Sequence, residues 1–83
     1  MPYIPQDDRP RFDAALRNLD PQTPGELNYC ITKLCLRYVD REGTSYTTLN
    51  AVHGALHCAD LELYRVVTAP YEDEKIKTNG VVR

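Results

Sequence analysis

The sequence predicts an all-α fold: an antiparallel helical hairpin with flanking short helices, assembled as a homo-oligomeric helical bundle. Three observations lead to this prediction. Apolar residues recur at helical spacing over most of the chain, capping signals separate the segments, and strand signals are almost absent. A chain of 83 residues leaves no room for a second domain, so we expect one domain over residues 1–83.

The first helix is expected over residues 8–19. Either Asp7 or Asp8 can cap its start, because a carboxylate accepts from the free backbone N–H groups of a first turn. Pro10 fits within that turn, where its missing N–H has no intrahelical partner. Pro21 ends the helix, since the residue before a proline is pushed out of the α region.

The second helix, residues 24–42, has the clearest start signal in the chain. Thr23 is the expected N-cap, Pro24 takes the first helical position, and Glu26 is placed to reach back as in a capping box. Gly43 is the natural residue just past the helix end. The next helix begins only two or three residues later, which favours an antiparallel hairpin.

The third helix is expected over residues 45–69, starting near Thr44 or Ser45, which are both good N-caps. Its apolar stripe has a mean spacing of about 3.5 residues and consists of Leu49, Val52, Leu56, Ala59, Leu63 and Val66. A second row beside it holds Ala51, Ala55, Cys58 and Leu61. A chain this short buries only about 60% of the surface that its unfolded form exposes, and its stability is therefore marginal. We expect the wide apolar face of the third helix to pack against copies of the chain.

Pro70 lacks a backbone donor and is expected to kink or end the third helix. A short fourth helix is predicted over residues 71–79, because its acidic residues come first and its lysines later, which complements the helix dipole. Asn79 and Gly80 close it.

Composition sets the expected surroundings. A net charge of −2 gives no basic field for duplex nucleic acid or for anionic lipid. No apolar run approaches the length of a signal peptide core or a membrane helix, so we expect a cytoplasmic protein with no membrane partner. The cysteines, Cys30, Cys35 and Cys58, lie in apolar helical patterns and match no zinc motif, which indicates a reducing compartment.

Catalytic motifs are weak, so we predict that the protein is not an enzyme and needs no cofactor. His53 and His57 are four apart on a helix and can share a metal, but a third ligand is not evident, so no metal site is expected. An acidic region lies around the proline that ends the third helix: Asp60, Glu62, Glu72, Asp73 and Glu74. These carboxylates do not converge at helical spacing as a magnesium site requires.

Tyrosine is the most unusual feature, with six tyrosines against one phenylalanine and no tryptophan. A tyrosine ring suits stacking on a nucleobase or rimming an interface, and packing between neighbouring helices is an equal alternative. Arginine and lysine beside such rings can hold phosphate groups. The predicted ligand-binding residues are Asn28, Tyr29, Arg65, Tyr71, Lys75 and Asn79.

Three peptides carry a family resemblance over nearly the whole chain: Met-Pro-Tyr-Ile-Pro-Gln-Asp-Asp-Arg, Gly-Glu-Leu-Asn-Tyr-Cys-Ile-Thr and Ala-Pro-Tyr-Glu-Asp-Glu-Lys-Ile-Lys-Thr-Asn-Gly. The chain resembles a small uncharacterised family shared by bacteriophages and bacteria, which implies a phage or prophage origin. Its Val81-Val82-Arg83 ending departs from the acidic and aromatic residues expected there. In size, class and tyrosine-plus-cation content the chain is also similar to phage anti-CBASS sponges, which sequester cyclic oligonucleotides.

The leading hypothesis is a phage-type anti-defence protein that binds and sequesters a small anionic nucleotide signal between subunits, without catalysis. If it is phage-encoded, it acts in the host cytoplasm. One alternative is a protein-interaction module that inhibits a host enzyme, which requires an exposed apolar patch. The other is a metal-dependent nucleotide pyrophosphohydrolase, which would use carboxylates such as Glu62 and Glu72.

Overall fold

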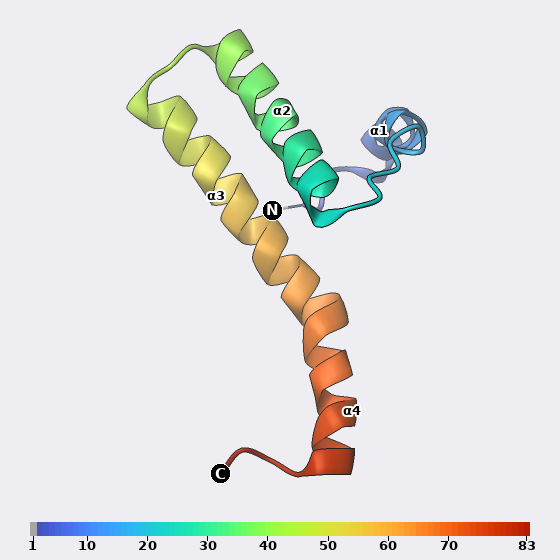
Figure 1. Cartoon of the computed structure of the whole chain (residues 1–83). Coiled ribbons are helices and arrows are strands. Elements are labelled where there is room, and N and C mark those ends of the chain that lie inside the picture. The colour runs from blue at the N-terminus through green and yellow to red at the C-terminus, as the bar shows by residue number, and fades with distance from the viewer. Residues whose placement is uncertain (1) are drawn as a thin grey trace. The chain divides into compact units, whose positions relative to one another are not determined.

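The computed structural model describes residues 2–83 and is all-helical (Figure 1). Helices make up 78% of it, and none of the described residues forms a strand. The chain divides into two compact units, one formed by Tyr3–His53 and the other containing Gly54–Arg83. The first unit holds α1, α2 and the start of α3. The second holds the rest of α3, a π-helical turn and α4.

The first helix differs from the prediction at both ends. A 3₁₀ turn, η1 (Gln6–Asp8), leads into α1 (Arg9–Leu16), and Pro10 lies in its first turn as expected. Asp8 makes no side-chain capping bond because its own backbone is already helical, with φ −88° and ψ −10°. The helix ends before Leu19, since the N–H groups of residues 18 and 19 bond three residues back and tighten the last turn.

α2 spans Pro24–Glu42, the bounds expected from its capping residues. The Glu26 N–H donates to Thr23 Oγ1 at 3.1 Å. The Glu26 carboxylate reaches back one residue further than a standard capping box, accepting from the Gln22 N–H at 2.8 Å. Gly43 ends the helix at φ +90°, a conformation open to glycine, and its N–H donates to the Val39 carbonyl at 2.7 Å.

α3 spans Tyr46–Leu63, and Ser45 precedes it as its N-cap. The Ser45 Oγ accepts from the Thr48 N–H at 3.1 Å, so the second of the two expected caps is the one used. Thr48 is also the one buried residue among those the structure describes. Gly43–Ser45 is the connection between α2 and α3, and the antiparallel hairpin expected from its shortness stays a prediction.

The sequence predicted a kink or an end at Pro70, and the structure has the kink, because helical backbone continues through this residue with a change of direction. A π-helical turn, η2 (Tyr64–Thr68), follows α3 directly and leads into α4 (Ala69–Asn79), so α4 begins before Pro70. The Ala69 N–H donates to the Tyr64 carbonyl, five residues back, which is the π pattern. This wider turn gives room for the ring of Pro70, and Figure 1 shows the helix axis changing direction there.

No hydrophobic side chain in residues 2–83 is fully buried. Leucine, isoleucine and valine residues on every helix remain exposed, from Leu16 on α1 to Ile76 on α4. The three cysteines are free and half-buried. The single chain therefore lacks the closed apolar interior that stabilises most domains of this size.

Candidate functional site

All six tyrosines are exposed, so none of them belongs to a core of the single chain. Their exposed fractions run from 45% for Tyr38 to 88% for Tyr46. Two of them, Tyr29 on α2 and Tyr71 on α4, are among the predicted ligand-binding residues and are 64% and 62% exposed. Exposed rings of this kind are available to stack on a flat ligand.

Both predicted tyrosines carry a lysine one helical turn later. The Lys33 Nζ lies 5.7 Å from the centre of the Tyr29 ring, and the Lys75 Nζ lies 5.3 Å from the centre of the Tyr71 ring. These distances fall within the range of cation–π contacts. Each pair places a positive charge over one face of an exposed ring.

The two pairs have polar neighbours of different kinds. On α4, Asn79 follows Lys75 by four residues, so Tyr71, Lys75 and Asn79 form one row, with successive members displaced by about 40° around the helix. On α2, Asn28 is engaged within the helix, since its Oδ1 accepts from the Thr32 hydroxyl at 3.0 Å. Of the predicted residues, Tyr71 and Lys75 are the pair that the structure brings together, and Asn79 lies one turn further along the same helix.

Arg65 stands apart from that row. Its Nε and one terminal nitrogen contact the two carboxylate oxygens of Glu62 at 3.2 and 3.1 Å, a bidentate arrangement. The hydrogen bond that Arg65 donates to Glu62, and then the charge of Glu62, raise the pKa of the Arg65 guanidinium. A ligand phosphate would have to compete with this carboxylate for Arg65.

Three of the five acidic residues around Pro70 are engaged with separate partners. Glu62 pairs with Arg65, Glu74 accepts from the Lys77 ammonium at 3.0 Å, and Glu72 accepts from the Tyr64 hydroxyl at 2.7 Å. Within residues 2–83 no three histidine, cysteine or acidic side chains gather as a metal ion would need. His53 and His57 accordingly have no third ligand beside them.

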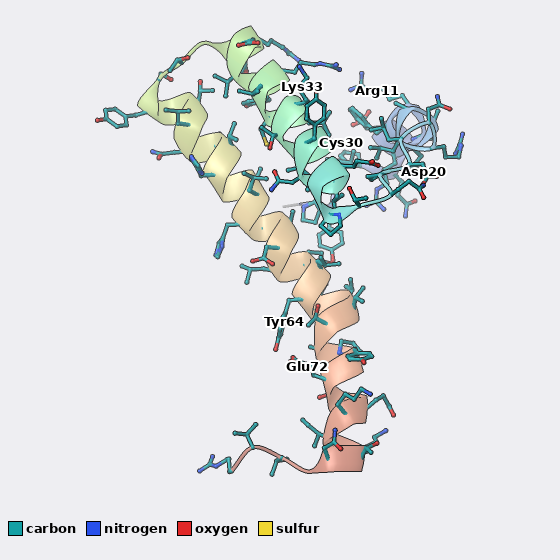
Figure 2. The ribbon with its side chains drawn as sticks, in the orientation of Figure 1. Arg11, Asp20, Cys30, Lys33, Tyr64 and Glu72 are labelled. Atoms are coloured by element: carbon teal, nitrogen blue, oxygen red, sulfur yellow. The ribbon has the colours of Figure 1, made fainter. Side chains whose placement is uncertain are left out.

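The structure adds two features to the predicted set of site residues. The hydrogen bond from the Tyr64 hydroxyl to Glu72 joins residues eight apart (Figure 2). In a regular α-helix two such residues are separated by about 80° around the axis and about 12 Å along it. The π turn between them reduces the rotation around the axis. No sequence signal reports such a turn. Lys33 is missing from the predicted ligand-binding residues, although its four-residue spacing from Tyr29 is a readable signal.

The fold and these surfaces define a small all-helical protein with exposed apolar faces and two tyrosine–lysine pairs. No described helix is both long enough and apolar enough to cross a bilayer. The chain belongs to the family described as "Domain of unknown function (DUF6899)", whose model matches residues 1–82. Membership of an uncharacterised family is thus confirmed. No curated protein and no solved structure matches the chain.

Proposed function

We propose that this protein binds a small anionic nucleotide through its tyrosine–lysine pairs and holds it without chemical change. The observation that carries the proposal is the repeated arrangement of an exposed ring with an ammonium over one face, at Tyr29–Lys33 and at Tyr71–Lys75. The free face of the ring stacks on a nucleobase, and the ammonium pairs with phosphate. Holding such a signal in stoichiometric amounts removes it from its receptor, which is the anti-defence role of a sponge.

The α4 pair is the stronger of the two candidate surfaces. Asn79 extends the row beyond Lys75 with an amide that can both donate to and accept from a base or a ribose. Within the described residues Lys75 lies over a ring, whereas Lys77 on the same helix is held by Glu74 at 3.0 Å. We assign the base to Tyr71, the phosphate to Lys75 and polar recognition to Asn79.

The proposal includes assembly. A homo-oligomer repeats the α4 row on every copy and brings rows from neighbouring copies near each other, so that one ligand can contact two subunits. Multivalent contact of this kind raises affinity without any new type of interaction. The exposed apolar side chains of the single chain support this part of the proposal.

Isothermal calorimetry against a panel of cyclic di- and trinucleotides tests the proposal. We expect binding by the wild-type protein, and recovery of the nucleotide intact after the complex is denatured. Tyr71→Leu should weaken binding roughly 5- to 150-fold, as loss of one base-stacking contact does. Tyr46→Leu is the matched control, because Tyr46 is 88% exposed but has Asn50 rather than a lysine four residues later.

A second pair of variants isolates the charge. Lys75→Met should weaken binding and reduce its dependence on salt, whereas Lys77→Met should leave both unchanged because Lys77 is paired with Glu74. Silence across the whole panel, or equal losses in Tyr71→Leu and Tyr46→Leu, would overturn the proposal.

The exposed apolar side chains also favour a second candidate function, that of a protein-interaction module inhibiting a host enzyme. Exposed fractions of 50% for Leu27 and 55% for Val67 suit burial against another protein. In that case a pulldown from host lysate returns one stoichiometric protein, and no nucleotide shifts the melting temperature.

A further inference from the structure

The apolar stripe of α3 has the spacing of a coiled-coil seam. Its residues alternate in steps of three and four along the helix: Leu49, Val52, Leu56, Ala59 and Leu63. This is the heptad pattern, with leucines in one core position and valine or alanine in the other. No charged or polar residue interrupts the seam within α3.

Exposure is highest at the end of this seam. Leu49 and Leu56 are both 38% exposed and Val52 between them is half-buried, whereas Leu63 is 58% exposed. The unit containing Gly54–Arg83 is a continuous helical stretch with a short C-terminal tail, so it includes no second helix to cover the seam. The part of the seam after Val52 is therefore the part that needs a partner.

A second copy of the chain fits this surface best. A heptad seam is self-complementary, because each core residue fits between four residues of an identical helix. The small Ala59 at its centre allows close approach of two helices. Glu62 beside the seam holds its own counter-ion, Arg65, at 3.1 Å, which limits repulsion between the flanking carboxylates of two copies.

The seam also has a defined end. Val66 and Pro70 occupy the next two positions of the repeat, and the π turn Tyr64–Thr68 shifts the register between α3 and Pro70. Val66 and Val67 within that turn are 54% and 55% exposed, so an apolar side chain continues the seam in either register. We propose that the helical stretch Leu56–Val67, which is the end of α3 and most of η2, pairs with the same stretch of a second copy as a short coiled coil. This inference specifies the assembly that the proposed function includes.

The inference is tested by measuring the molar mass of the full chain by light scattering at low micromolar concentration. Two variants, each with one leucine replaced by glutamate, are compared with the wild type. Leu63→Glu places a charge on the seam, and Leu61→Glu places the same charge two residues away, on a side chain that is 54% exposed but about 200° around the helix. We expect an oligomeric wild type, an unchanged mass for Leu61→Glu, and a single-chain mass for Leu63→Glu.

If Leu63→Glu does not fold, Leu63→Ala replaces it. We then expect the dissociation constant of the oligomer to rise roughly 30-fold or more, with helical circular dichroism retained at high protein concentration. A folded wild-type monomer overturns both the seam and the assembly part of the proposed function. An oligomer whose mass is insensitive to Leu63 variants, or equally sensitive to Leu61→Glu, overturns the seam alone, and nucleotide binding is judged separately by the Tyr71 variants.

Discussion

The helices α2 and α4 each carry a proline in the first turn, and the two prolines have different consequences. Pro24 is the first residue of α2, which follows extended backbone at Thr23, with φ −129° and ψ 159°. Pro70 is the second residue of α4, but the residue before α4, Thr68, is itself helical, with φ −69° and ψ −48°. One proline begins a helix, and the other lies inside continuous helical backbone.

The comparison shows that a capping side chain, more than a proline, determines where a helix starts. Thr23 accepts a hydrogen bond from the Glu26 N–H, and Thr68 makes no such bond. Without a cap to stop the preceding helix, the chain accommodates Pro70 by widening one turn. Four predictions test this difference. Unless stated otherwise, the measured quantity is the free energy of unfolding in urea at a fixed protein concentration.

The largest effect is expected from Pro70→Ala. Alanine supplies the missing N–H and removes the ring that the π turn accommodates, so stability should rise by up to about 3 kcal/mol. Pro24→Ala should have the opposite sign and lower stability by about 0.4–1 kcal/mol, because proline there restricts only the unfolded chain. If Pro70→Ala and Pro24→Ala changed the free energy of unfolding equally, the two prolines would not differ in their effect on the helices.

The next effect concerns the ends of the same two helices. Gly43 and Gly80 have similar backbone angles, with φ +90° and φ +84°. Gly43→Ala should cost about 1–3 kcal/mol, because both α2 and α3 depend on this connection. Gly80→Ala should cost less, because Val81–Arg83 form no helix or strand and Gly80 therefore supports one helix where Gly43 supports two. A larger loss at Gly80 would contradict this ranking.

The cap itself should contribute a smaller amount. Thr23→Ala removes the acceptor of the Glu26 N–H and should lower stability by about 1 kcal/mol. Thr68→Ala is the matched control at the start of α4, where no side-chain cap exists, and should change stability by less than about 0.5 kcal/mol. Comparable losses from both variants would show that the capping bond is not the source.

The smallest effect is a pH dependence at the π turn. The hydrogen bond to Glu72, and then its charge, raise the pKa of the Tyr64 hydroxyl above its usual value of about 10. The neutral form is favoured in the folded state, so this contribution is complete below pH of about 10 and is lost as pH rises through the raised pKa. Tyr64→Phe should remove this component, as measured by circular dichroism between neutral and alkaline pH. An identical pH profile for both proteins would contradict it.

Sequence reasoning worked where the signal is local. Thr23, Gly43 and Ser45 act on backbone groups within four residues of themselves, and they predicted the ends of α2 and the start of α3. It failed at the π turn, because a five-residue hydrogen bond depends on the geometry that Pro70 imposes and leaves no composition signal. The all-helical class followed from the apolar periodicity, the capping signals and the near absence of strand signals.

The candidate site was predictable to the same extent. Tyr71 and Lys75 meet because four residues make about one turn of α4. Arg65 was predicted from its charge, but the carboxylate of Glu62, three residues earlier, already occupies its guanidinium. The sequence identified which residues carry positive charge. Only the structure distinguished the cations paired with a carboxylate from those placed over a tyrosine ring.

The π turn also constrains how this chain can change in length. Tyr71, Lys75 and Asn79 lie after it and Leu56 and Leu63 lie before it, on one uninterrupted stretch of helical backbone. A wide turn that loses one residue can close into an ordinary α turn, so a single deletion within Tyr64–Thr68 should leave the downstream residues facing nearly as before. A single deletion elsewhere between Leu56 and Asn79 rotates every later residue of the helix by about 100°. Single-residue deletions should therefore be tolerated better within Tyr64–Thr68 than on either side of it.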